Sequence, residues 1–182
     1  MNPWIKHEWI SAGANLCEDK CDRPLNSDLP IFEFCLIKKL DIFNHLPDPG
    51  EDFHLCLKDG DFCDSEFPKL SGLTSMVYLD LWCSGWNNPD KFKCIRGNFP
   101  WLRGVGLEST SIEDSFLENL PNPANLNDLN LRSTRLTDEG LRLLLRYPAL
   151  RRLDIRGTSV TTEGIQMLCD AFDQRLQIVH DN

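Results

Sequence analysis

Residues 126–144 read LNDLNLRSTRLTDEGLRLL, and this stretch decides the fold. The same pattern occurs at residues 102–120, LRGVGLESTSIEDSFLENL, and at residues 150–168, LRRLDIRGTSVTTEGIQML, so that the three copies begin at equal intervals along the chain. In the first six positions of each copy, apolar residues recur at the spacing of a strand, and the second half follows helical spacing. A single strand and helix cannot bury both of their apolar faces alone, so the repeat predicts a solenoid of stacked units.

Weaker copies extend the repeat in both directions. Upstream, the same columns hold Leu55, Leu57 and Phe62, and then Met76, Leu79, Leu81 and Trp86. Downstream, Leu176 and Ile178 are expected at the positions equivalent to Leu153 and Ile155. The pattern therefore predicts about five units and a closing strand within residues 52–182.

The polar residues between strand and helix predict where each helix begins. Thr137 and Thr161 are suited to a helix N-terminus because their hydroxyls can cap free backbone N–H groups. The acidic pairs Glu113–Asp114 and Asp138–Glu139 recur at one repeat position, so we interpret them as helix starts rather than as acid–base catalysts.

The pattern LxxLxLxxTxLTDEGLxxL, clearest over residues 101–168, resembles leucine-rich repeats of the cysteine-containing type, as found in F-box substrate receptors and their bacterial relatives. This chain has Thr where that type often has Cys or Asn. This difference weakens the assignment to the cysteine-containing subtype but does not affect the expected fold. The resemblance implies an α/β fold: a short right-handed horseshoe with parallel strands on its concave side and helices on its convex side. It also implies a protein ligand on the concave sheet.

Residues 1–51 do not match the repeat, and we expect them to form a helical N-terminal cap. Four apolar residues there follow helical spacing: Phe34, Ile37, Leu40 and Phe43. An alternative is that LPIFEFCLIKKLDIFNHLP, at residues 29–47, forms an F-box-like helix that recruits a ubiquitin ligase.

Composition restricts the partner and the chemistry. The net charge of −9 argues against nucleic acid or an anionic membrane as the main partner. The N-terminus lacks the pattern of a secretory signal, so we expect a cytoplasmic protein. The eight cysteines lack a paired metal-ligand spacing; Cys17 and Cys21 could combine with His7 or His54 only as a weak alternative. We expect no metal, no cofactor and no enzymatic activity, with Cys56 and Cys83 structural rather than reactive.

Outward strand positions define the candidate partner-binding residues. They are Tyr78, Trp82, Arg103, Asn130, Arg132, Arg151, Arg152, Asp154 and Arg156. Tyr78 and Trp82 would form an aromatic anchor, and the arginines a basic strip for an acidic protein. Alternatively, the arginines pair with Asp80, Glu108, Asp128 and Asp154 on neighbouring strands.

We therefore expect a non-catalytic module that binds a protein of unknown identity and that could form one piece of a larger complex. The alternatives are an F-box-like adaptor and an inhibitor or immunity-type protein that occludes a toxin or effector.

Overall fold

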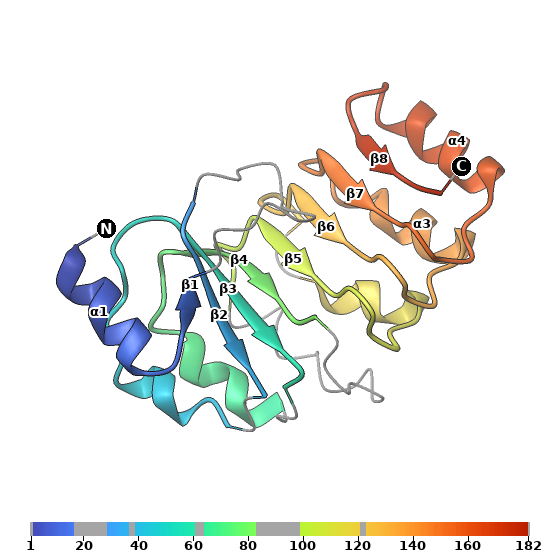
Figure 1. Ribbon diagram of the computed structural model, residues 1–182. Coiled ribbons are helices and arrows are strands. Elements are labelled where there is room, and N and C mark those ends of the chain that lie inside the picture. Colours follow the sequence, from blue (N-terminus) through green and yellow to red (C-terminus); the bar gives the residue numbers. More distant parts are fainter. Residues whose placement is uncertain are drawn as a thin grey trace.

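The computed structural model describes residues 2–16, 29–36, 39–60, 64–82, 99–120 and 123–181. Its strands form an eight-stranded sheet in which β1 to β8 follow one another in chain order. Every neighbouring pair is parallel except β1 and β2, which are antiparallel. The helical segments that follow β3, β5, β6 and β7 lie on one side of the sheet (Figure 1), as the repeat predicts.

The strands are short, as expected for a repeat of this length. They are β1 (Asn15–Leu16), β2 (Ile31–Cys35), β3 (Phe53–Lys58), β4 (Met76–Asp80), β5 (Gly104–Gly106), β6 (Asp128–Asn130), β7 (Arg152–Asp154) and β8 (Gln177–Val179). The α-helices are α1 (Pro3–Ser11), α3 (Asp138–Leu144) and α4 (Thr162–Ala171). Three 3-10 helices are η1 (Asp41–Asn44), η2 (Asp64–Leu70) and η4 (Asp114–Asn119).

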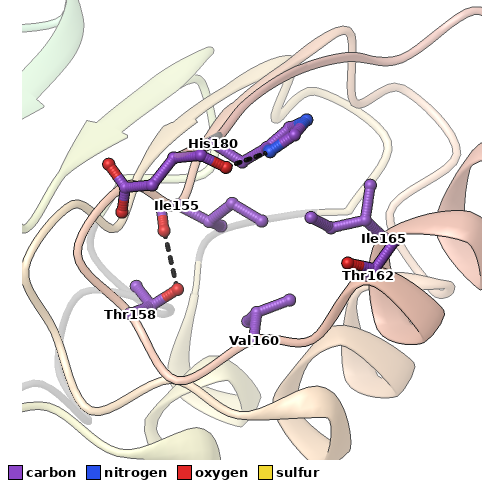
Figure 2. A pocket seen from close by; sticks show the side chains of 7 residues that line it. Ile155, Thr158, Val160, Thr162, Ile165 and His180 are labelled. Carbon is purple, nitrogen blue, oxygen red and sulfur yellow. Dashed lines mark hydrogen bonds between the residues drawn. The ribbon is translucent and has the colours of Figure 1, made fainter.

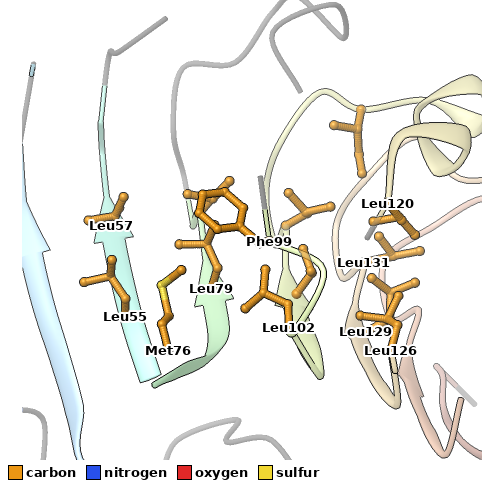
Figure 3. Packing of buried hydrophobic residues seen from close by; sticks show 14 of the residues in the cluster. Leu55, Leu57, Met76, Leu79, Phe99, Leu102, Leu120, Leu126, Leu129 and Leu131 are labelled. Atoms are coloured by element: carbon orange, nitrogen blue, oxygen red, sulfur yellow. The ribbon is translucent and has the colours of Figure 1, made fainter. Parts of the chain in front are cut away.

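The register of the central strands confirms the repeat alignment. The inward column contains Leu55, Leu79, Val105, Leu129 and Leu153, each paired with the next. All five side chains are fully buried between the sheet and the helical layer, where they join the leucines of the neighbouring turns (Figure 3). Burying one such side chain contributes roughly 1.5–3 kcal/mol, so the stack of units is stabilised mainly by this column and its neighbours. Phe62 and Trp86, also expected in apolar columns, lie outside the described residues.

The helical layer is joined by carboxylates that reach from one unit to the next. Asp138 accepts hydrogen bonds from the backbone N–H (2.9 Å) and the hydroxyl (2.7 Å) of Thr161, and Asp114 makes the same pair with Thr137. The bonds from Thr161 hold the pKa of Asp138 below its usual value. Each threonine also caps its own helix, as expected, because its hydroxyl accepts a backbone N–H bond.

Glycines in the helical layer allow this close approach. A Cβ atom on Gly164 would collide with the Asp138 carboxylate, and one on Gly140 would collide with that of Asp114. The T-x-E-G sequence at each helix start thus combines a cap with a contact between units.

The N-terminal segment differs from the predicted helix. Residues Ile31–Cys35 form strand β2, whose Phe32 and Phe34 pair with Leu55 and Leu57 of β3. Phe32, Phe34, Leu40 and Phe43 are all buried, but they belong to a strand, a turn and the 3-10 helix η1; Ile37 lies outside the described residues. The helical prediction was wrong because apolar residues at 34, 40 and 43 matched a helical period across a strand–turn boundary. The F-box-like alternative loses the helix on which it rested.

A helix does cover the first end of the sheet. Trp9 of α1 is fully buried, and the centre of its ring lies 4.5 Å from that of Phe32 and 5.3 Å from that of Phe53. Its indole N–H donates a hydrogen bond of 2.9 Å to the carbonyl of Pro47. Strand β1 pairs with the outer edge of β2. Helix α1 and strand β1 therefore act as the cap.

The closing strand is shifted from its predicted register. Ile178, not Leu176, pairs with Leu153 across β7 and β8, so the connection before the last strand is longer than the repeat predicts. Asp173 and Gln174 both have positive φ values and add a turn after α4, which accounts for the extra length. After β8, the carboxylate of Asp181 accepts the N–H of Gly157. Ser109 and Ser133, at the equivalent positions of earlier units, donate to a carbonyl of the following unit instead.

Strands β2, β3, β5, β6 and β7 are each followed by the same tight turn. Leu36, Asp59, Ser109 and Ser133 have positive φ values between 50° and 56°, and Gly157 has the equivalent position with φ 67°. The next residue in the three strong units is the predicted threonine column, Thr110, Thr134 and Thr158, whose hydroxyls each donate to the carbonyl three residues earlier at 2.6–2.7 Å. The threonines thus close the turn within their own unit.

Replacing Gly157 with alanine should therefore destabilise the fold. The substitution forces a Cβ into a left-handed conformation and places it 3.0 Å from the Ser133 hydroxyl. We expect a loss of about 1–2 kcal/mol in the free energy of unfolding, measured by urea denaturation. Gly72→Ala is the matched control, because a Cβ at this exposed turn would meet no atom within 4 Å. An equal loss in both variants would show that the turn conformation is not the cause.

Candidate functional site

The sheet surface that faces away from the helical layer, called the open face here, carries the polar strand positions. Its first column contains His54, Tyr78, Gly104, Asp128 and Arg152, and its second contains Glu33, Cys56, Asp80, Gly106, Asn130 and Asp154. The third column lies two residues further along each strand and contains Cys35, Lys58, Trp82, Glu108, Arg132 and Arg156.

The first two columns are mostly buried even though they face away from the core. Tyr78 is 5% exposed, Asn130 4%, Arg152 8% and Asp154 0%. These four predicted contact residues are therefore components of the sheet surface rather than protruding side chains. The prediction that Tyr78 projects from the sheet as an anchor was wrong. Its ring covers Gly104, where a Cβ would collide with it. The centre of the Tyr78 ring lies 5.1 Å from the centre of the His54 ring.

Neighbouring strands are linked on this face by ion pairs. Arg152 lies between Asp128 (3.3 Å) and Asp154 (3.7 Å). Asp154 also binds Arg156 through two bonds, of 2.6 Å to Nη2 and 3.0 Å to Nε. A single carboxylate thus orients two guanidinium groups, an arrangement suited to the planar fork of arginine.

Two further pairs continue the pattern. Glu108 accepts a hydrogen bond from Asn130 (3.2 Å) and forms an ion pair with Arg132 (3.4 Å). At the other end, Lys58 pairs with Glu33 at 2.6 Å. The alternative in which the arginines pair with Glu108, Asp128 and Asp154 is therefore observed, but Asp80 is not among the acids so paired.

The third column is the accessible part of the open face. Side-chain exposure is 27% for Lys58, 35% for Arg132 and 26% for Arg156. Trp82 is also partly exposed, and the Lys58 ammonium lies 4.6 Å from the centre of its ring. Here the structure brings together one aromatic and three cationic side chains at the ends of β3, β4, β6 and β7.

The remaining predicted arginines lie elsewhere. Arg103 precedes β5 and pairs with Asp52 at 2.8 Å, and Arg151 precedes β7 and donates to the carbonyls of Pro148 and Leu150. Both are exposed at the opposite end of the strands from Arg132 and Arg156. The five arginines therefore do not form one continuous basic strip.

Asp80 has an unusual environment that no sequence pattern indicated. Its carboxylate leans over Gly106, where a Cβ would lie 2.6 Å from Oδ1. The Oδ1 atom is sealed from solvent and has no hydrogen-bond partner among the described residues. The signal in the sequence was the Gly-Val-Gly segment at 104–106, which leaves β5 without outward side chains beside Tyr78 and Asp80.

The electrostatic environment of Asp80 opposes its ionisation. Burial raises the pKa of Asp80 to about 7, and the nearby carboxylate of Glu108 acts in the same direction. The Lys58 ammonium lowers this pKa, but Glu33 and Asp128 add to the rise. At neutral pH the side chain is thus held between its charged and neutral forms.

Two of the described thiols, Cys35 and Cys56, are poorly suited to nucleophilic chemistry. Burial strongly raises the pKa of Cys56, and it also raises that of the exposed Cys35, with the Glu33 hydrogen bond adding to the effect. Cys17, Cys21 and Cys83 lie outside the described residues. His7 lies on α1 and His54 on β3, and no cluster of three metal-ligating side chains occurs in the described ranges.

A hollow of about 230 Å³ lies at the far end of the solenoid. Ile155, Val160 and Ile165 line it together with Thr158, Thr162, His180 and Asp181 (Figure 2). No pattern in the sequence singled out this position. It is the space beside the last strand and helix where a further unit would pack in a longer solenoid.

Neutralising Asp80 should stabilise the protein at high pH. An unfolded aspartate titrates near 3.9, so between about pH 4 and pH 7 the folded state holds a proton that the unfolded state has lost. Stability contributed by this proton is present in full below pH 4, falls as the pH rises through 7 and stays low above it. We expect Asp80→Asn to raise the free energy of unfolding by on the order of 2 kcal/mol at pH 8 and to change it little at pH 4, as measured by urea denaturation.

The matched control is Asp59→Asn, which removes the same charge from an exposed turn beside β3. It should change the free energy of unfolding by less than about 0.5 kcal/mol at both pH values. A destabilised Asp80→Asn at pH 8 would contradict the unfavourable environment assigned to this carboxylate.

Comparisons with known proteins agree with this architecture. A family model described as Leucine Rich repeat matches residues 122–145 and 148–169. An internalin from Listeria monocytogenes has a similar solved structure, with a TM-score of 0.52 and 18% sequence identity over 78% of this chain. The match covers 36% of the internalin chain. No curated protein matches this sequence significantly.

Among the described residues, no helix has the length and apolar character needed to cross a membrane. Residues 122–145 and 148–169 match leucine-rich repeats, and the fold of the described chain is an α/β leucine-rich-repeat solenoid.

Proposed function

We propose that this chain is a non-catalytic module that binds a protein ligand on its open face. The observation that carries the proposal is the contrast between the buried first and second columns and the accessible third column. Trp82, Arg132 and Arg156 stand at the ends of nearby strands, and tryptophan and arginine dominate the energetics of protein interfaces.

Ion pairs that hold the accessible arginines prepare this surface for binding. Because Asp154 and Glu108 hold Arg156 and Arg132, these long side chains lose little further rotational freedom when a ligand docks. Immobilising one such side chain otherwise costs about 0.5–1.5 kcal/mol. The guanidinium groups then offer donors to carboxylates or backbone carbonyls of the ligand.

The proposed activity is steric: the ligand is occluded or recruited, and no covalent bond changes. The raised pKa values of Cys35 and Cys56 support this proposal, since neither thiol is poised for attack. Trp82 and Lys58 would form an aromatic and cationic contact at one end of the surface, with Arg132 and Arg156 at the other.

Replacing both Arg132 and Arg156 with glutamine should strongly weaken binding of the protein ligand. Glutamine can still donate to Glu108 and Asp154, so the double variant is designed to fold while losing both charges. The measurement is affinity capture from native lysate, with bound proteins identified by mass spectrometry and folding checked by circular dichroism. We expect a bound protein to decrease by at least about tenfold, equivalent to 1.4 kcal/mol.

Arg142→Gln/Arg146→Gln is the control, because it removes the same charge from exposed positions of the helical layer. A ligand retained by the open-face variant and lost by this control would transfer the site to the helical layer. A ligand retained by both variants would count against the third column as the binding surface.

A further inference from the structure

We propose that Asp80 is the docking point for a cationic side chain, lysine or arginine, of the protein ligand. This inference deepens the proposed function and rests on it. Among the described residues of the open face, every other carboxylate contacts a cation of the same face, and Asp80 does not.

Four carboxylates of the open face each contact a cation of the same face. The pairs are Glu33 with Lys58, Glu108 with Arg132, Asp128 with Arg152, and Asp154 with Arg156. Asp80 has no such partner within the described ranges. When Asp80 is ionised, this surface therefore carries five carboxylates and four cations.

The neighbouring strands explain why the partner is missing. On β5, the positions beside Tyr78 and Asp80 are Gly104 and Gly106, which have no side chain to offer. On β3, Lys58 is held by Glu33 and lies over Trp82. Neither neighbouring strand thus supplies a cation to Asp80 within the described residues, and we assign this cation to the ligand.

The local chemistry favours a side-chain cation as that guest. Asp80 is partly exposed, so one side of the carboxylate can be reached although Oδ1 is sealed. Two residues further along the chain, the indole of Trp82 already holds the Lys58 ammonium 4.6 Å from its ring centre, so an aromatic surface that accepts cations lies near Asp80 in sequence. A bound metal ion is less suitable, because the described residues contain no cluster of three metal-ligating side chains.

Binding of a cation would be linked to loss of a proton. The groups around Asp80 come from each packed element: Glu33 on β2, Lys58 and Cys56 on β3, Glu108 after β5, and Asp128 on β6. Because the pKa of Asp80 is about 7, the carboxylate is mostly neutral at pH 6 and mostly ionised at pH 8. The guest should therefore bind roughly tenfold more tightly at pH 8 than at pH 6.

The test uses the full chain and N-acetyl-arginine methylamide as the probe, with the lysine and glutamine analogues beside it. The Trp82 indole N–H and the Asp80 carboxyl carbon are followed by NMR during the titration. We expect saturable shifts with the arginine or lysine analogue, none with the neutral glutamine analogue, and roughly tenfold weaker binding at pH 6. Asp59→Asn should behave as wild type, whereas Asp80→Asn should lose the Trp82 shift.

Two results would overturn the inference: no saturable shift in the wild type, or equal shifts in the wild type and Asp80→Asn. The same variant in affinity capture separates this inference from the proposed function. If Arg132→Gln/Arg156→Gln loses the ligand and Asp80→Asn keeps it at full strength, the binding surface stands and the Asp80 site is wrong. If the probe binds Asp80 and the arginine variant keeps every captured protein, the proposed surface is wrong instead.

Discussion

Every unit of this protein depends on its neighbours to exclude water from one column of aliphatic side chains. Leu55, Leu79, Val105, Leu129 and Leu153 pair along that column, and none is accessible to solvent. Because a single strand and helix cannot bury this column alone, stability is shared along the chain rather than held in one centre. The Asp–Thr bonds of the helical layer and three ion pairs of the open face follow the same rule, since they join one unit to the next: Glu33 with Lys58, Glu108 with Arg132, and Asp128 with Arg152.

The central units could be predicted from the sequence because their local and global requirements agree. The leucine columns, the threonines at helix starts and the acidic positions all recur at one interval, and the structure places them as expected. The ends could not be predicted in the same way. IFEFC at 31–35 has the alternation of a strand, but the apolar residues at 34, 40 and 43 matched a helical period as well. The turn at Asp173 and Gln174 shifted the register of β8, and backbone conformation of that kind leaves little trace in a hydrophobic pattern.

The candidate site was predicted by position but not by environment. The register placed Tyr78, Asn130, Arg152 and Asp154 in the outward columns but not Arg103 and Arg151, and it could not show that two of the three columns are buried by their own neighbours. Burial on an outward face depends on side-chain length and on pairing between side chains. Arg152 and Arg156 pair with Asp154, which is fully buried, and the Tyr78 ring covers Gly104. The role of Asp80 depends on what is absent from Gly104 and Gly106, and an absent side chain becomes informative only when the neighbouring strand is known.

The two ends of the solenoid are closed to different degrees. At the first end, Trp9 packs among four phenylalanine rings, and an antiparallel strand covers the edge. At the other end, the Asp181 carboxylate replaces one backbone bond of a missing unit, and an open hollow remains beside Ile155. In a chain whose units are stabilised by neighbours, this asymmetry gives unfolding a direction. Amide hydrogens of β8 and α4 would exchange with solvent first. Protection of the amides from exchange would then rise unit by unit toward the end that Trp9 of α1 covers.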